Sequence, residues 1–227
     1  MKLSINYFWK AFITKKKKGI ISKKYIARFI PPNPVIIEAG AHVGMDTLEM
    51  AQLWPGGEIH AFEPIPELFE RLFEKTRNFN NVHCYKLALS NFTGRSKMYV
   101  SSGASNSSSS LLFPKDHLIV HPDVQFKETI DVDVTTIDDF LLRKRIKRVD
   151  FLWLDIQGSE LAAMKASPRA LMSVCAIHTE VSLKEVYENV PLYEETRTWL
   201  NDNGFRVVIE ALPWSDMGNV LFVRSKI

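Results

Sequence analysis

Residues 35–47 read VIIEAGAHVGMDT. The first three residues form a β-branched apolar run, which is typical of a strand buried on both faces of a sheet. A turn with two glycines follows, and residues 46–53 then place apolar side chains at helical spacing. A strand that leads through a glycine turn into a helix is the place where open α/β sheets bind their ligands. This stretch therefore predicts both the fold class and the position of the site.

Strands and helices alternate along the rest of the chain. Short apolar runs predict strands, and apolar side chains at helical spacing predict helices. The expected strands lie at residues 58–63, 82–87, 150–155, 174–181, 205–210 and 219–224, and the expected helices at residues 66–77, 159–165 and 192–203. This alternation indicates a parallel sheet. The link between the last two strands is too short for a crossover, so the last strand should run antiparallel.

A long polar segment interrupts this alternation. Two extra strands are expected at residues 97–100 and 130–134, and between them lies the serine-rich segment, residues 101–110. A long loop inside a compact domain is usually functional or mobile. The composition leaves two interpretations open, a disordered tip and a lid over a substrate or cofactor site.

Length and composition bound the organisation of the chain. The 227 residues, 46% of them hydrophobic, are enough for one α/β domain with a sizeable core. Residues 31–34 read PPNP and end any preceding helix, so we divide the chain into a leader or helix at residues 1–33 and a domain at residues 34–227. The net charge of +3 gives a weak field, which permits an anionic partner without requiring one.

The leader contains an apolar run at residues 5–13 and then four lysines at residues 15–18. A secretory signal has the opposite order of charge and apolar residues. We favour an amphipathic helix with a solvated lysine cluster over a weak peripheral contact of that cluster with anionic lipid. No apolar run approaches the ~18 residues of a transmembrane helix. Cys84 and Cys175 lie in apolar runs, which is typical of buried free thiols, and we expect a cytoplasmic protein.

The glycine turn indicates the kind of ligand. Three residues separate Gly40 from Gly44, which does not match the G-x-G-x-x-G spacing of a dinucleotide site. Gly40 removes the side chain that would block close approach of a ligand to the backbone. Gly44 lets the turn pack into the start of a helix, whose free N–H groups attract a carboxylate or phosphate. Glu38, at the strand end, would repel a pyrophosphate but suits the ammonium group of an amino acid.

Glu63 ends the second expected strand, roughly 20 residues after the glycine turn, where an acid accepts hydrogen bonds from both ribose hydroxyls. Pro64 then breaks the strand and fixes the turn. A solvated carboxylate is the alternative for Glu63 alone, and its spacing from Glu38 and the glycine turn disfavours that alternative. The pattern predicts an adenosyl ligand with a zwitterionic end.

Four segments together resemble the FkbM family of S-adenosylmethionine-dependent methyltransferases. They are EAGAHVGMDT at residues 38–47, AFEP at 61–64, ALSNFTG at 88–94 and LDIQGSELAAMKA at 154–166. The first two motifs occur in many methyltransferases, whereas the last is much more specific, and the resemblance spans about residues 35–223. It implies S-adenosylmethionine as cofactor and a Rossmann-like, seven-stranded, mostly parallel sheet with an antiparallel last strand and helices on both faces. It also implies methyl transfer to a hydroxyl of a sugar, glycan or natural product.

The resemblance extends the expected site, because residues 87–90 would lie under the adenine. The residues that we expect to bind the cofactor are Glu38, Gly40, His42, Gly44, Thr47, Glu63, Pro64, Ala88, Leu89 and Asp155. The expected partner is a small-molecule or glycan acceptor, whose pocket residues 101–124 and 183–191 should shape. Trp214 is either an ordinary loop residue or a wall of that pocket. The sequence does not indicate an oligomeric state.

The candidate catalytic residues are Asp155, His178 and Glu180. Asp155 ends the strand at residues 150–155, where a carboxylate can take the proton from a hydroxyl acceptor. Its alternative role is to orient the cofactor ammonium. His178 and Glu180 share one face of a strand, and a structural role is the alternative for the histidine. Two carboxylates at adjacent strand ends also suit a hard cation, but we assign no metal ligands.

Two other functions use the same fold. Nucleic-acid methyltransferases that act on exocyclic base nitrogens usually carry Asp/Asn-Pro-Pro-aromatic after this strand, to stack a flipped base. Residues 155–158 read DIQG, so the stacking residue is missing, and the basic run at residues 143–148 better fits a solvated helix end than an RNA contact. A non-catalytic S-adenosylmethionine-binding module is disfavoured because Glu38, Glu63 and Asp155 are all present.

Overall fold

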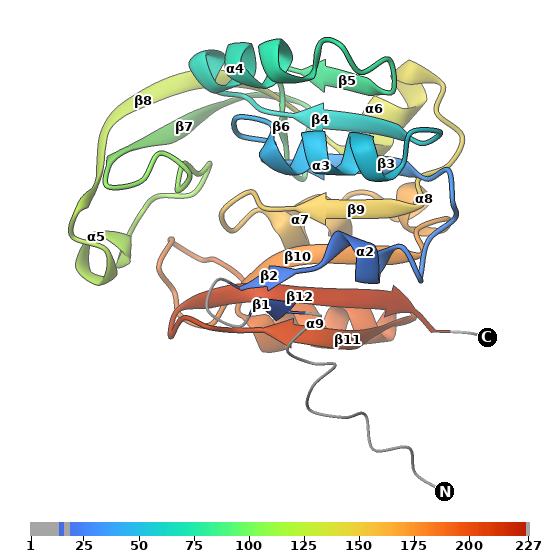
Figure 1. Cartoon of the computed structure of the whole chain (residues 1–227). Coiled ribbons are helices and arrows are strands. Elements are labelled where there is room, and N and C mark those ends of the chain that lie inside the picture. Colours follow the sequence, from blue (N-terminus) through green and yellow to red (C-terminus); the bar gives the residue numbers. More distant parts are fainter. Residues whose placement is uncertain (1–13, 16–18, 226–227) are drawn as a thin grey trace, which may run out of the picture.

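A seven-stranded sheet forms the centre of the computed structural model, which describes residues 14–15 and 19–225 (Figure 1). In spatial order its strands are β11 (Phe205–Ala211), β12 (Met217–Arg224), β10 (Ala176–Ser182), β9 (Phe151–Leu154), β3 (Val35–Ala39), β4 (Glu58–Phe62) and β5 (Val82–Tyr85). Neighbours from β10 to β5 pair in parallel, whereas β12 runs antiparallel to β10 and β11. The predicted α/β fold with a reversed last strand is confirmed.

Helices cover both faces of this sheet because its central strands are apolar on both sides (Figure 1). One face packs against α2 (Lys23–Ile26), α3 (Met45–Leu53) and α4 (Pro66–Thr76). The other packs against α6 (Ile137–Lys144), α7 (Glu160–Lys165), α8 (Pro168–Leu171) and α9 (Tyr193–Asp202). On β3, Ile36 belongs to the first layer and Ile37 to the second, and both are fully buried. Burial of neighbouring residues on opposite faces fixes the register of β3.

The polar middle of the chain forms an arm beyond the carboxyl ends of the parallel strands (Figure 1). Its elements are β6 (Ala88–Leu89), β7 (Gly94–Gly103), α5 (His117–Val120) and β8 (Val124–Thr135). β8 pairs antiparallel with β7 and parallel with β6. The two extra strands were predicted at the right place, but they are longer than predicted because they pair along most of their length.

The serine-rich segment folds back along this arm. The Ser101 and Ser109 hydroxyls lie 3.1 Å apart, and the Ser110 hydroxyl donates to the carbonyl of Gln157 at 2.7 Å. The backbone of Ser110 also bonds in both directions with Tyr99. These bonds tie the segment to the turn after β9 and favour a lid over a disordered tip.

The first described residues pack on the main sheet. β1 (Thr14–Lys15) pairs with β2 (Ile20–Ile21), and Ile21 and Ile26 are fully buried against the layer that contains α3. The apolar run expected at residues 5–13 and most of the lysine cluster lie outside the described residues. The boundary between residues 33 and 34 stays a prediction.

Two smaller expectations concern the cysteines and the membrane. Cys84 and Cys175 are free, as expected, but half-buried rather than buried. In the part of the chain that the structure describes, no helix combines the length and apolar character needed to cross a membrane.

Gly40 lies where the turn after β3 meets the turn after β9. Its φ is +80°, and a Cβ atom there would lie 1.8 Å from the backbone oxygen of Asp155. The sequence suggested that this glycine makes room for a ligand. The structure shows that the missing side chain first makes room for the neighbouring turn.

We expect Gly40→Ala to cost about 3 kcal/mol or more of unfolding free energy, because backbone overlap adds to the cost of a left-handed alanine. Gly204→Ala is the matched control, since Gly204 has a φ of +81° and the nearest atom to its Cβ would be 3.8 Å away. That control should lose only about 1–2 kcal/mol. Urea denaturation measures both, and equal losses would contradict the role given to the close approach.

Candidate functional site

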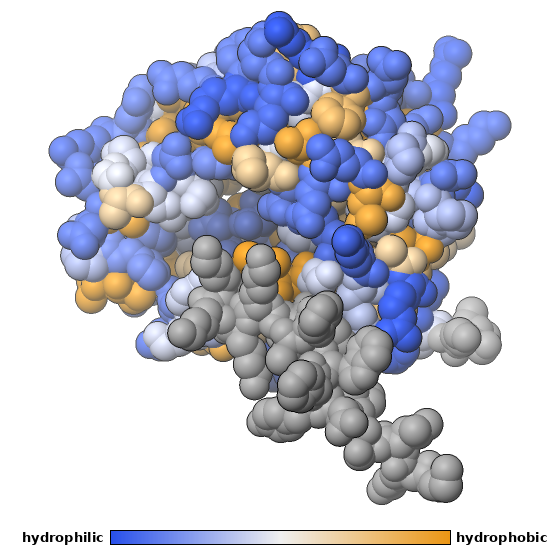
Figure 2. Space-filling view, in the orientation of Figure 1, coloured by the Kyte–Doolittle hydropathy of each residue, from blue (hydrophilic) through white to orange (hydrophobic). Residues whose placement is uncertain are grey.

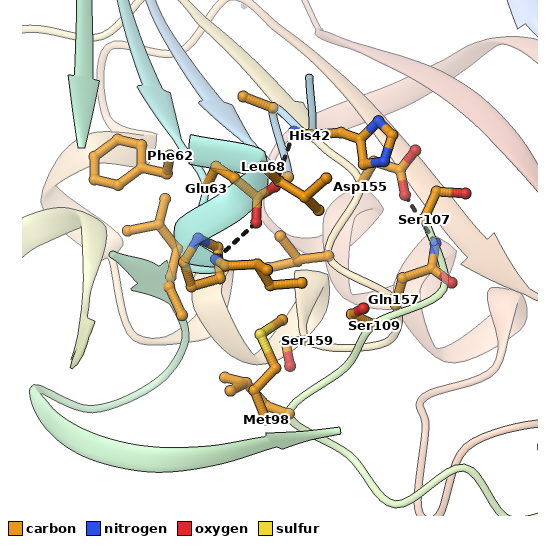
Figure 3. A pocket seen from close by; sticks show the side chains of 18 of the residues that line it. His42, Phe62, Glu63, Leu68, Met98, Ser107, Ser109, Asp155, Gln157 and Ser159 are labelled. Carbon is orange, nitrogen blue, oxygen red and sulfur yellow. Dashed lines mark hydrogen bonds between the residues drawn. The ribbon is translucent and has the colours of Figure 1, made fainter. Parts of the chain in front are cut away.

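Two adjoining cavities lie at the carboxyl ends of the parallel strands, and the surface is hollowed between the arm and the main sheet (Figure 2). The first has a volume of about 220 Å³ (Figure 3). The predicted cofactor residues that line it are Gly40, His42, Glu63, Pro64, Ala88, Leu89 and Asp155. Glu38, Gly44 and Thr47 are buried and do not line it.

Glu63 points its carboxylate into the first cavity from the end of β4 (Figure 3). One oxygen accepts from the backbone N–H of His42 and the other from that of Ile65, both at 2.9 Å. These two bonds fix the carboxylate while leaving it further lone pairs. Burial raises the pKa of Glu63 to about 7. The carboxylate can therefore accept hydrogen bonds from a ligand diol, as the sequence predicted.

Glu38 lies beneath the first turn of α3 and is only 1% exposed. Its Oε2 and the Thr47 hydroxyl oxygen are buried without a hydrogen-bond partner among the described residues. Burial raises the pKa of Glu38 to about 8, and the charge of Asp46 acts in the same direction, against the lowering influence of Lys23. A buried acid in this state is stabilised by a cation brought near it. Any interaction of Glu38 with the ligand ammonium is consequently electrostatic or relayed, because Glu38 is not part of the cavity wall.

The turn between β3 and α3 is held on two sides. Gly44, with a φ of +77°, caps α3, and a Cβ atom there would lie 2.8 Å from the Leu72 side chain. His42 also has a positive φ, and its Nε2 lies 3.0 Å from Oδ1 of Asn106 in the serine-rich segment. Gly44 therefore fits the turn against α4, while His42 connects the turn to the arm.

Much of the remaining wall of the first cavity is apolar, although Ser107, Ser109 and Ser159 also line it. The apolar part is formed by Phe62, Ile65, Leu68, Leu87, Ala88, Leu89, Met98 and Leu111. A flat apolar base such as adenine suits this wall. Of residues 87–90, which the family resemblance pointed to, the first three line the cavity and Ser90 does not, and sequence reasoning missed Met98 and Leu111. These lie on the arm, and only the folding of the arm brings them to the cavity.

The second cavity is larger, about 590 Å³, and adjoins the first. The residues that line both are Asp46, Ser107, Asp155 and Gln157. Part of its wall comes from residues 19–23 and from Trp214 and Asn219 near β12. Ser107 and Ser108 agree with the expected contribution of residues 101–124. Residues 183–191 do not line this cavity, and the contribution of residues 19–23 was not predicted.

Asp155 directly follows β9 and Glu180 lies near the end of the neighbouring strand β10, and the amide of Gln157 joins them. The Gln157 Nε2 donates to Asp155 Oδ1 at 2.9 Å and to Glu180 Oε2 at 2.8 Å. Burial raises the pKa of Asp155 to about 6, while the Gln157 hydrogen bond lowers it. Burial also raises the pKa of Glu180 well above its usual value, and the charge of Asp155 adds to this.

His178 forms part of the wall of the second cavity and stacks on Trp153, with ring centroids 3.7 Å apart. Its Nδ1 is buried without a partner among the described residues. Burial, with a contribution from the charge of Lys23, lowers its pKa to about 3. His178 is therefore neutral near pH 7 and a weak base, better suited to hydrogen bonding with a hydroxyl than to removing its proton.

The residues of the first cavity fit S-adenosylmethionine. Glu63 offers acceptors for the ribose hydroxyls, the apolar wall suits adenine, and Glu38 lies buried near the glycine turn, where a nearby ammonium would favour its ionised form. Among the described residues, no group of three or more His, Cys, Asp or Glu side chains is arranged to hold a metal ion.

Comparison with known proteins agrees with this geometry. A family model described as "Methyltransferase FkbM domain" matches residues 38–207. The 2-O-methyltransferase NoeI of Sinorhizobium fredii is 28% identical over 173 residues, which cover 74% of this chain and 71% of that protein.

Solved structures share the fold. Methyltransferase FkbM from Methylobacillus flagellatus superposes with a TM-score of 0.53 at 15% identity, over 85% of this chain but only 44% of that one. The N-terminal domain of EvdMO1, in the presence of S-adenosylhomocysteine and D-fucose, gives a TM-score of 0.51 at 13% identity, over 89% of this chain and 81% of that one. Both likenesses support a class I methyltransferase fold.

We expect Glu63→Gln to weaken S-adenosylhomocysteine binding by about 10- to 100-fold, because a charged acceptor of two ribose hydroxyls is lost. Isothermal titration calorimetry measures the affinity, and circular dichroism checks folding. Glu67→Gln is the control, since Glu67 is exposed in the first turn of α4. Equal affinity for wild type and Glu63→Gln would place the ribose elsewhere.

Cofactor binding should also release protons near pH 7. The pKa of Glu38 is raised to about 8 and that of Glu63 to about 7, so both are partly protonated before the ammonium group and ribose hydroxyls of the ligand arrive. S-adenosylhomocysteine titrations in phosphate and in Tris should give different heats, equivalent to about one proton or less. Glu38→Gln should reduce this difference, and identical heats for the wild type in both buffers would refute the linkage.

Proposed function

Because this chain belongs to the FkbM methyltransferase family, we propose that it transfers a methyl group from S-adenosylmethionine to a hydroxyl of a sugar, glycan or related natural product. Dependence on S-adenosylmethionine follows from the family and the fold. Our proposal for the acceptor is based on the second cavity, which adjoins the first at Asp155.

The second cavity has the chemistry of a site for a hydroxylated molecule. It combines an aromatic surface at Trp214, which is 44% exposed, with the polar residues His178 and Asn219. Most residues that line this cavity are polar, and placed polar groups give orientation and specificity to a bound small molecule. The name of NoeI, a 2-O-methyltransferase, and the D-fucose present with the EvdMO1 domain support a sugar as the acceptor.

Asp155 is the best-placed base for this reaction. It lines both cavities, so its carboxylate lies where a hydroxyl in the second would meet the first. S-adenosylmethionine supplies an electrophilic methyl group when bound. Asp155 would take the proton of the attacking hydroxyl, and its pKa of about 6 leaves it mostly ionised at neutral pH. Glu180 and His178 line only the second cavity and would orient the acceptor.

The protein's larger contribution is alignment. A base that removes the proton increases the rate on the order of 10²–10⁴-fold. Holding the hydroxyl in line with the methyl group and excluding water contribute more to the rate. The serine-rich segment contributes to both tasks, because Ser107 lines both cavities. The basic run at residues 143–148 leads into β9 and therefore lies near the amino ends of the parallel strands, whereas the cavities lie at the carboxyl ends. This position disfavours a nucleic-acid acceptor.

We expect Asp155→Asn to lower kcat by about 10²–10⁴-fold and to remove the rise in rate with pH around 6. Transfer of labelled methyl to a panel of simple pyranosides and non-sugar alcohols measures the rate, and mass spectrometry locates the methyl group. Asp202→Asn, at the exposed end of α9, is the control. Wild-type rates in Asp155→Asn would remove this residue from catalysis, and a wild type that binds cofactor without methylating any acceptor would indicate a binding module.

A further inference from the structure

Gln157 occupies a conformation that its surroundings impose. Its φ is +53°, in the left-handed region, and it is followed by Gly158 with a φ of +105°. The Glu160 carboxylate accepts from the backbone N–H groups of Ile156 and Gly158 at 2.7 and 2.9 Å, and the Ser110 hydroxyl donates to the Gln157 carbonyl. A strained residue persists where neighbours determine it on several sides, and such residues concentrate at functional sites.

Nearly all hydrogen-bonding groups of the Gln157 side chain have a partner. An amide nitrogen has two hydrogens, and here one reaches Asp155 and the other Glu180. The amide oxygen lies 3.0 Å from the hydroxyl of Tyr187. These bonds orient the amide so that its N–H donors face the two carboxylates. Hydrogen bonds from these donors stabilise negative charge on the carboxylates.

Tyr187 connects this amide to the serine-rich segment. The tyrosine is 1% exposed and packs with Val186 and Val190. Its hydroxyl lies 2.7 Å from the Ser108 carbonyl as well as near Gln157, so its single hydrogen serves one of two acceptors. Burial and the surrounding carboxylates raise the pKa of Tyr187, so it remains a donor at any working pH.

We propose that Gln157 is a positioning residue for methyl transfer, oriented by Tyr187, and that it holds the Asp155 carboxylate at the junction of the two cavities while the serine-rich segment is in place. The inference rests on the proposed function. It also gives a role to residues 183–191, which act through Tyr187 rather than by lining the acceptor cavity.

The charges around Asp155 show why a residue that positions this carboxylate is needed. The acids whose charges act on the pair Asp155 and Glu180 from the surrounding elements are Asp46, Glu160 and Asp216. All of them raise the pKa of one or other member of the pair, and burial acts in the same direction. Only the Gln157 hydrogen bond lowers the pKa of Asp155. Removing the amide donors should therefore shift Asp155 toward its protonated form, which cannot accept a proton.

The test compares Gln157→Glu and Tyr187→Phe with Tyr193→Phe, whose buried hydroxyl instead donates to Glu210 outside both cavities. Gln157→Glu should lower kcat about 100-fold, with S-adenosylhomocysteine affinity changed less than about threefold, and move the pH of half-maximal rate upward by about one unit or more. Tyr187→Phe should lower kcat by about five- to tenfold with a smaller change in acceptor KM. Tyr193→Phe should match the wild type.

A second readout does not depend on turnover. The ¹³C NMR titration of the Asp155 carboxyl, in protein saturated with S-adenosylhomocysteine, should move to higher pH in Gln157→Glu and stay near wild type in Tyr193→Phe. Absence of methyl transfer in the wild type, with that titration shift present, would overturn the proposed function and leave the Gln157 contact standing. An unshifted titration, or wild-type kcat and pH profile in Gln157→Glu, would overturn the positioning role.

Discussion

Two backbone turns meet at the centre of the site with no side chain between them. The turn after β3 passes so close to the turn after β9 that Gly40 has room only for a hydrogen atom, facing the Asp155 carbonyl. This approach brings the cofactor side of the site, with Glu63 and the glycine turn, against the strand end that carries the candidate base. If the turns were further apart, the two cavities would not share Asp155 and Gln157. The alignment that methyl transfer requires is thus set by backbone packing in a close-packed interior.

The buried acids around these turns make the ligand-free site electrostatically unfavourable. Burial raises the pKa values of Glu38, Glu63 and Asp155, so each carboxylate costs free energy until a cation or a hydroxyl approaches it. S-adenosylmethionine carries an ammonium and a sulfonium. These positive charges would offset the negative charge of the three carboxylates. Functional sites commonly depart in this way from what stability alone would favour.

The parts of this arrangement that were predictable from sequence are those with a local signature. Apolar periodicity located the strands, and the glycine turn with Glu63 at its spacing located the first cavity. The exact role of Glu38 was not predictable, since its depth depends on how α3 covers β3. The second cavity was predictable only in part, because Asp155, His178 and Glu180 follow from the strand pattern, whereas Lys23 and Asn219 are far apart in sequence and meet only through the position of β12. The contacts of Gln157 were missed for the same reason, since a single amide carries no periodic pattern.

The position of β12 between β10 and β11 affects any truncated protein that is limited to the residues matched by the family model. A fragment of residues 38–207 would lack β12, residues 19–26, the first three residues of β3 and the last four of β11, although the family model spans it fully. β10 would then become a sheet border with a row of unsatisfied N–H and C=O groups, which invites strand-to-strand aggregation. Trp153 and His178 would lose the cover that residues 19–23 give to their cavity. Insolubility of such a fragment would therefore report missing strand residues and not a property of the intact domain.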